Sequence, residues 1–403
     1  MTKCALVLRH RMESQMNCTE KYTKLFGSEP EHTSFCPYRI SPLGAHVDHQ
    51  GGHINGLAID MGIHFAYSAV PDGSFELASV NFDGTIRFTR EEIGERAHGD
   101  WADHCRGAVR MLAEKYPINV GIRGVIEGSF PIGGLSSSAS VIVVFMKALA
   151  DLNGVTLGDW ELIELAKAAE NRYVGVSCGK LDQCCEVLSK KDNILFLDCS
   201  NDSYELIPKA AGMAEFDIAV FFSGLERSLA GSAYNLRLDE CRAAAYSLLE
   251  FAGIERKSIA ETTLRSVPRD AFDAFEGRLP EVFARRARHF FNEDERAVLG
   301  AEAWRRGDIE EYGRLIFESG KSCIELYECG CPELITLYRI MADTPGIYGG
   351  CFSGAGFKGS CMALVRHDSI DSVTATVKEK YLKAFPALEN KFTYTVCRSA
   401  DGV

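Results

Sequence analysis

Hydrophobic and polar residues alternate along positions 57–69. The odd positions are apolar and the even ones small or polar, the apolar set being Leu57, Ile59, Met61, Ile63, Phe65, Tyr67 and Ala69. This period of two predicts a long strand with one buried face, because successive strand side chains point to opposite sides. Shorter strand-like runs at 75–80, 85–89 and 120–126 follow. The first half should therefore open as a mostly antiparallel sheet.

Helical spacing replaces this alternation after residue 134. An apolar stretch from Ser136 predicts a helix ending near Gly154, and residues 159–173 predict a second helix with Asp159 as its N-cap. Further on, strands are expected at 194–198, 216–222, 361–365 and 391–397, and helices at 337–341 and 370–383. We expect two α+β domains, 1–200 and 201–403, with a cleft between them.

Size and charge limit the possible functions. The 403 residues are 46% hydrophobic and 25% charged, which is typical of a globular protein with two cores. A net charge of -12 argues against nucleic acid as a partner. No apolar run approaches the roughly 20 residues of a membrane span, and Arg9, His10 and Arg11 interrupt the N-terminal apolar stretch, which makes it a poor secretory signal.

Fifteen cysteines are scattered along the chain, and no two of them are three residues apart. An odd number without a CxxC pair argues against a disulfide framework and against a zinc or redox site of that type. We interpret the cysteines as reduced, mostly buried thiols of a cytoplasmic protein.

A glycine- and serine-rich segment, PIGGLSSSAS at 131–140, lies directly before the apolar helix. Glycines allow close approach to a ligand, and a helix N-terminus offers free N–H groups that suit a polyphosphate. The structural alternative is a turn in which Ser136 caps the helix. The Gly-Lys-Ser/Thr of a Walker A loop is absent.

Two other glycine-rich segments and one acidic residue are candidates. The segment 349–361 is equally well explained as a hairpin. The segment 37–56, expected as a loop, holds Arg39 and the polar residues His46, Asp48, His49 and His53, for which a sugar-binding loop is favoured over a zinc site because the spacing is not that of a metalloprotease. Taken alone, Asp182 after a tight turn would be a local cap.

Together, these segments resemble the GHMP kinases, a family that includes galactokinase and the homoserine, mevalonate and phosphomevalonate kinases. KYTKLFGSEPE, GAHVDHQGG with Arg39, GVSCGKLDQ and SAYNLRLDEC resemble galactokinase segments, over residues 21–365. The resemblance implies an α+β, two-domain fold, N-terminal ribosomal protein S5 domain 2-like and C-terminal α/β sandwich. It also implies an active site in the interdomain cleft, ATP and Mg²⁺ as cofactors, and a monomer or weak homodimer.

The resemblance also implies roles for individual residues. Asp182 and Arg39 match the catalytic pair, and Ser138 and Glu170 match the Mg²⁺ ligands. The remaining positions fall into two groups, one for ATP and one for the sugar: Gly133, Gly134, Leu135, Ser136, Ser137, Ser138 and Trp101 for ATP, and Ala45, His46, Asp48, Gly179 and Tyr234 for the sugar.

The chain departs from galactokinases at Ala45, where they carry a glutamate that binds the 6-hydroxyl of the sugar. A second carboxylate at that point would repel a 6-carboxylate, so alanine suits D-galacturonate. The segments YECGCPELITLYRI and PGIYGGCFSGAGFKG also resemble plant-type galacturonokinases. We therefore expect ATP-dependent phosphorylation of the anomeric hydroxyl of D-galacturonate. The alternatives are a galactokinase and a non-catalytic sugar- and ATP-sensing relative.

Lys180 and Lys358 are candidate partners for the 6-carboxylate, together with nearby backbone N–H groups. The segment from Pro131 to Leu135 is one residue shorter than the family pattern, which predicts a tightened loop.

Overall fold

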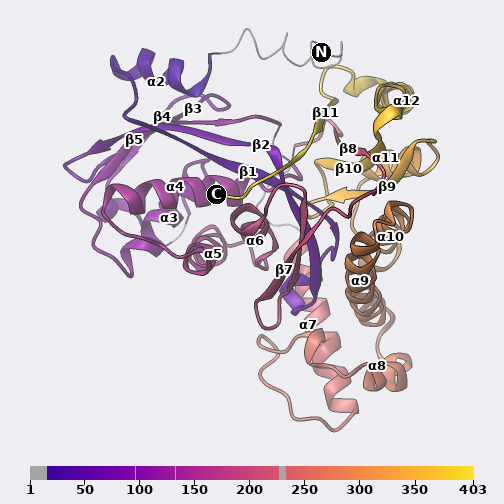
Figure 1. Cartoon of the computed structure of the whole chain (residues 1–403). Helices are drawn as coiled ribbons and strands as arrows, with labels where there is room; N and C mark the ends of the chain where they lie inside the picture. Colours follow the sequence, from indigo (N-terminus) through magenta and orange to yellow (C-terminus); the bar gives the residue numbers. More distant parts are fainter. Residues whose placement is uncertain (1–15, 96, 132, 227–232) are drawn as a thin grey trace.

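The computed structural model describes residues 16–403 except 96, 132 and 227–232, and it contains two β-sheets (Figure 1). The interpretation of residues 1–15 lies outside this range. The larger sheet has the order β4-β3-β5-β2-β6-β7, and both β1 and β12 also pair with β2. Its strands are β1 (His32–Leu43), β2 (His53–Val70), β3 (Phe75–Ser79), β4 (Thr85–Phe88), β5 (Gly121–Gly128), β6 (Asn193–Asp198), β7 (Ser203–Pro208) and β12 (Ser399–Ala400).

The predicted alternating strand is β2, at the centre of this sheet. It pairs with β1, β5, β6 and β12, always antiparallel, whereas β3 and β5 are parallel. Leu57, Ile59 and Phe65 on its apolar face are almost fully buried. The expected mostly antiparallel sheet is confirmed.

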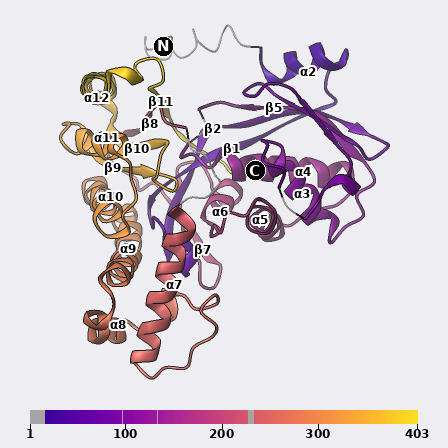
Figure 2. The same ribbon diagram turned by 180° about the vertical axis from the view of Figure 1, so that it is seen from behind.

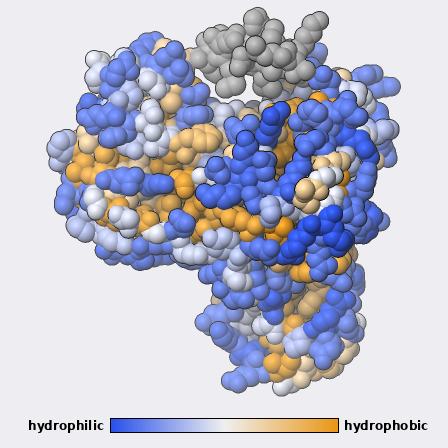
Figure 3. All heavy atoms as spheres, viewed as in Figure 1, coloured by the Kyte–Doolittle hydropathy of each residue, from blue (hydrophilic) through white to orange (hydrophobic). Residues whose placement is uncertain are grey.

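Most helices of the first half lie on one side of the larger sheet, one short helix packs on its other side, and the last helices of the chain lie beside the smaller sheet (Figures 1 and 2). The helices of the first half are α2 (Cys18–Phe26), α3 (Asp103–Ala113), α4 (Ser137–Leu152), α5 (Asp159–Ala168) and α6 (Leu181–Leu188). Those of the second half are α7 (Ala233–Phe251), α8 (Arg269–Phe275), α9 (Glu281–Arg306), α10 (Ile309–Ser322), α11 (Pro332–Ala342) and α12 (Ile370–Ala384). Most of the surface seen in Figure 3 is hydrophilic, and its apolar residues gather in a band across the middle.

The smaller sheet has the order β11-β8-β10-β9. Its strands are β8 (Phe216–Phe222), β9 (Ile347–Ser353), β10 (Ser360–Arg366) and β11 (Thr393–Cys397). After β11 the chain returns to the larger sheet, where Ser399 pairs with Ile59 of β2. The last residues therefore tie the two sheets together, and a domain boundary near residue 200 stays a prediction.

Several local expectations need correction. Residues 37–43 belong to β1 rather than to a loop. The segment 349–361 forms the hairpin that the sequence left open as an explanation, because β9 and β10 pair antiparallel. The helix expected over 159–173 is α-helical only to Ala168 and continues as a π-helical turn, Ala169–Val174. Its N-cap is Gly158 instead of Asp159. The strands β7 and β12 were not predicted.

The cysteines of the described residues are all free, and most are buried, as expected. No helix among these residues combines the length and the apolar character needed to cross a membrane.

Candidate active site

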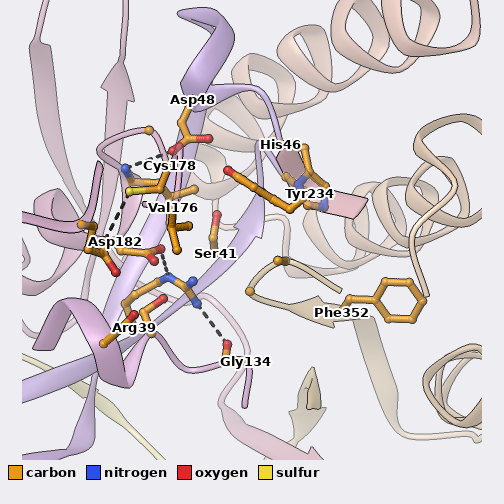
Figure 4. Close-up of a pocket in the computed structure, with 18 of the residues that line it drawn as sticks. Arg39, Ser41, His46, Asp48, Gly134, Val176, Cys178, Asp182, Tyr234 and Phe352 are labelled. Atoms are coloured by element: carbon orange, nitrogen blue, oxygen red, sulfur yellow. Dashed lines mark hydrogen bonds and ion pairs between the residues drawn. The ribbon is translucent and has the colours of Figure 1, made fainter. Parts of the chain in front are cut away.

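A pocket lies where β1, the segment before α4, the start of α6, the start of α7 and the β9–β10 hairpin meet (Figure 4). Segments more than 300 residues apart in the sequence form its wall. Most of the predicted site residues line it, namely Arg39, Ala45, His46, Asp48, Gly133, Gly134, Ser136, Ser137, Ser138, Glu170, Gly179, Asp182 and Tyr234.

Arg39 and Asp182 form an ion pair in this pocket. Nε of Arg39 donates to Oδ1 of Asp182 at 2.6 Å, and Nη1 donates to the carbonyl oxygen of Gly134 at 3.2 Å. Arg39 is 3% exposed. Its burial alone would lower the pKa, but the charge of Asp182 and this hydrogen bond outweigh burial and raise it. The side chain of Asp182 keeps 26% of its surface accessible and lies in the first turn of α6. A fixed cation thus lies beside a carboxylate that a ligand can reach.

The two glycine-rich segments pack backbone against backbone. Oγ of Ser353 donates to the carbonyl oxygen of Gly134 at 2.6 Å, and Oγ of Ser360 donates to that of Gly133 at 2.8 Å. Gly134 has φ +91°, and a Cβ atom there would lie 2.7 Å from the carbonyl oxygen of Ser353. The β9–β10 hairpin therefore requires glycine at this position and holds the loop against the pocket.

Helix α4 begins directly after this loop. Ser136 is the N-cap residue of α4, but it has φ +59° and its side chain makes no capping hydrogen bond, so the alternative of a side-chain cap is not supported. The first N–H groups of an α-helix lack intrahelical acceptors. Ser136, Ser137 and Ser138 line the pocket at this end, which gives it the character of an anion-binding surface.

Glu170 lies in the π-helical turn at the edge of the pocket and is 4% exposed. Its Oε2 accepts a hydrogen bond from Nε2 of Gln183 at 2.7 Å and one from the thiol of Cys178 at 3.3 Å. Burial, and after it the charge of Asp182, raises the pKa of Glu170, whereas a hydrogen bond from Ser138 acts in the opposite direction. A divalent cation beside these oxygens would favour the charged carboxylate. The group therefore fits a metal site.

Asp48 and Gly179 are in direct contact on the other side of the pocket. Asp48 lies in a 3₁₀ turn after β1, and its Oδ2 accepts a hydrogen bond from the backbone N–H of Leu181 at 3.2 Å. A Cβ atom on Gly179 would overlap this carboxylate. The contact places Asp48 close to the start of α6, which carries Asp182.

Buried polar groups of α9 hold the backbone at Ala45, and the ring of Tyr327 supports His46. Oε1 of Glu293 accepts hydrogen bonds from the N–H groups of Gly44 and Ala45 at 2.9 and 3.2 Å. The carbonyl oxygen of Ala45 accepts one from Nε2 of His289 at 2.9 Å. The ring of His46 stacks on Tyr327, with centroids 4.0 Å apart. The sequence pattern did not predict these supports.

The histidines of the 37–56 segment do not converge on one metal site. Nε2 of His49 lies 3.3 Å from the hydroxyl of Tyr327, and Nδ1 of His53 lies 2.9 Å from Oδ1 of Asp294. His46 and His49 both contact Tyr327, one at its ring and the other at its hydroxyl, whereas His53 contacts Asp294, which opposes a zinc site formed by these three histidines.

Some predicted residues lie elsewhere. Leu135 is buried and does not line the pocket. Trp101 stacks on Phe82 at 6.1 Å, outside the pocket lining. The ammonium of Lys180 pairs with Asp202 and Glu164 and lines a neighbouring cavity instead, and Lys358 is exposed in the hairpin turn. Cys178 and Gln183 were not predicted, although both lie in the quoted GVSCGKLDQ segment.

Family comparisons agree with this architecture. Residues 103–190 match the GHMP kinases N terminal domain, residues 301–383 match the GHMP kinases C terminal model, and residues 20–69 match the galactokinase galactose-binding signature. A galacturonokinase of Arabidopsis thaliana is 38% identical over 389 residues, which cover 91% of each chain. A galactokinase of Limosilactobacillus fermentum is 32% identical, over 91% of this chain and 94% of its own.

Solved structures show the same fold. Lactococcus lactis galactokinase complexed with galactose superposes with a TM-score of 0.86 at 29% identity, covering 95% of this chain and 97% of its own. Methanococcus jannaschii mevalonate kinase superposes with a TM-score of 0.62 at 14% identity, covering 92% of this chain and 98% of its own. At this low identity, the similarity concerns the fold only. The two-domain α+β fold expected from the sequence is confirmed.

Proposed function

This chain belongs to the GHMP kinase family and is a sugar kinase that transfers phosphate to an alcohol, and we propose that its acceptor is the anomeric hydroxyl of D-galacturonate, with ATP as donor. The observation that carries the chemistry is the ion pair of Arg39 and Asp182, which lies in one pocket with the glycine-rich loop and is hydrogen-bonded to it at Gly134. An acceptor at the carboxylate and a polyphosphate at the loop would meet there.

In the proposed reaction, Asp182 accepts the proton of the anomeric hydroxyl as its oxygen attacks the γ-phosphorus. The new bond joins that oxygen to phosphorus, and the bond between the γ-phosphorus and the bridging oxygen breaks to leave ADP. Arg39 keeps Asp182 oriented and stabilises negative charge on the transferred group.

The nucleotide would lie along the loop and α4. The backbone of Gly133 and Gly134 and the serines 136–138 would contact the phosphates, and the half-exposed Trp101 beside Phe82 offers an aromatic face for adenine. Ser138 and Glu170 would hold Mg²⁺, which when bound neutralises phosphate charge. The contacts of Glu170 with Gln183 and Cys178 would keep its carboxylate directed toward the pocket.

The sugar would occupy the side lined by His46, Asp48, Gly179 and Tyr234. The acidic residues among the described pocket lining are Asp48, Glu170 and Asp182. Residue 45, next to His46, is an alanine and adds no carboxylate there. The imidazole of His46 is then the group that would meet the C6 carboxylate. The identity to a galacturonokinase supports the same substrate.

Parallel assays with D-galacturonate and D-galactose test the proposal. We expect a kcat/KM at least about tenfold higher for galacturonate, since placing or removing one charge pair is worth about 1.4 kcal/mol or more. Equal or reversed preference would favour the galactokinase alternative, which the match to the galactose-binding signature supports. If no ADP formed from ATP with either sugar, the non-catalytic sugar- and ATP-sensing alternative would be favoured.

A further inference from the structure

The imidazole of His46 and the thiols of Cys323 and Cys329 form a buried cluster beside the pocket. The ligand atoms of His46, Cys323 and Cys329 all lie within 4.8 Å of one another, and Nε2 of His46 is 3.6 Å from Sγ of Cys329. Each of the three residues is at most 8% exposed. His46 also lines the pocket. Within the described part of the chain, this is the one group of three possible metal ligands so close together.

The backbone holds the two thiols side by side. A π-helical turn, Cys323–Tyr327, ends at Glu328 with φ +58°, and the N–H of Cys329 then donates to the carbonyl oxygen of Cys323 at 3.0 Å. Such a helix end brings the residues on either side of it into contact. The structural alternative to a metal site is that the two thiols act only as small apolar groups in the core.

The backbone conformation and the ring orientation of His46 are also fixed. It has a left-handed φ of +62°, which is unfavourable for a residue with a side chain, and its ring lies at 9° to that of Tyr327. This conformation directs a ring nitrogen to the sulfur of Cys329. Apolar packing of two thiols would not require a ring nitrogen at that point.

The spacing suits a tetrahedral cation. With metal–sulfur bonds of about 2.3 Å and metal–nitrogen bonds of about 2.0–2.1 Å, adjacent sulfur and nitrogen ligands lie about 3.5–3.6 Å apart, close to the separation of His46 and Cys329. Two thiolates and one neutral imidazole also make the site neutral with a divalent ion, so that no uncompensated charge is buried. Hard Mg²⁺ disfavours sulfur ligands.

We propose that His46, Cys323 and Cys329 bind a thiophilic divalent cation of the Zn²⁺ class, and that this cation inhibits the kinase by withholding His46 from the sugar. Binding forms two metal–sulfur bonds and one metal–nitrogen bond and releases both thiol protons to solvent. The pocket at His46 provides the entry path. The inhibitory part rests on the sugar-binding role of His46 proposed above.

The test uses reduced, metal-free full-length protein titrated with Co²⁺ in the absence of sugar and ATP. We expect a thiolate-to-cobalt charge-transfer band at about one ion per chain, and the same stoichiometry for Zn²⁺ by equilibrium dialysis. Cys329→Ala should weaken binding at least about 100-fold, because loss of a ligand exceeds the 10–100-fold effect of losing an outer contact. Cys323→Ala is a second, independent variant in case the first does not fold, as judged by thermal unfolding.

Two control variants locate the effect. Cys331→Ala, two residues along the same loop, and Cys178→Ala, beside Glu170, should bind Co²⁺ as the parent does. The metal site would be overturned if the band were absent, or if the Cys329 and Cys323 variants bound Co²⁺ as tightly as the parent protein. Neither outcome would affect the proposed kinase activity, which the sugar assays test separately. Galacturonate should weaken Co²⁺ binding, and by linkage Zn²⁺ should raise the KM for the sugar. A site that binds Co²⁺ without any effect of sugar would overturn the inhibitory part.

Discussion

A Cβ atom on Gly179 would lie 2.1 Å from Oδ2 of Asp48 and 2.8 Å from the backbone N of His49. Neither neighbour has room to yield, because Asp48 is also bound to the N–H of Leu181. The side of the pocket that we propose for the sugar therefore depends on the absence of a side chain at residue 179.

Replacing this glycine should displace the carboxylate. For Gly179→Ala we expect the sugar KM to rise at least about tenfold, with overpacking costing about 1–3 kcal/mol of stability. Steady-state kinetics with saturating ATP and a thermal unfolding curve measure both effects. Gly175→Ala is the matched control for the turn, since a side chain there meets no atom within 4 Å, although its φ of +85° adds backbone strain. An unchanged sugar KM in Gly179→Ala would contradict the assignment.

Neutralising Asp182 should stop proton acceptance. Asp182→Asn keeps an oxygen that accepts from Arg39 but loses the charge, and we expect kcat to fall about 10²–10⁴-fold while ATP still binds. Rapid-quench kinetics and nucleotide-binding calorimetry test the two halves. Asp202→Asn, which affects an acid paired with Lys180 outside the pocket lining, serves as control. A substantial residual rate in Asp182→Asn would remove this residue from the mechanism.

A carboxylate restored at residue 45 should reverse the substrate preference. For Ala45→Glu we expect kcat/KM for galacturonate to drop at least about tenfold through charge repulsion, and that for galactose to rise. The backbone contacts of Ala45 with Glu293 and His289 are independent of its side chain. Ala45→Gln, of similar size without charge, should affect galacturonate less. Equal effects of Glu and Gln would show that size rather than charge decides.

Acid should destabilise the support of the sugar pocket through His289. Burial lowers the pKa of His289 from 6.5 to about 4, against the smaller opposing effects of Glu293 and the bond to Ala45. The unfolded chain therefore binds a proton that the folded protein excludes. Stability from this group is complete above pH 6.5 and is lost as the pH falls toward 4, by about 3 kcal/mol in total.

Urea midpoints at pH 7 and pH 5 measure this loss. His289→Gln keeps a donor for Ala45 without titrating in this range, so its midpoint should change less between the two pH values than that of the parent. An identical change in both proteins would assign the pH dependence to other groups.

Strong periodicity and ordered motifs were sufficient to predict much of the molecule. The alternation over 57–69 predicted β2, and the apolar run after Ser136 predicted α4, because burying one face of a strand or helix leaves its period in the chain. The order of the motifs predicted the family. Glycine-rich composition was a poorer guide, since residues 37–43 and 349–353 are strands whose neighbours decide their conformation.

The sequence by itself therefore determined most of the local elements, the kinase family and many of the residues that line the pocket. Only the tertiary structure decided which of those residues meet. The packing of Gly134 against Ser353, the ion pair of Arg39 with Asp182 and the cluster of His46 with Cys323 and Cys329 each join segments more than 100 residues apart. Contacts of this kind depend on how two sheets and their helices pack, and no repeating pattern along the chain records that packing.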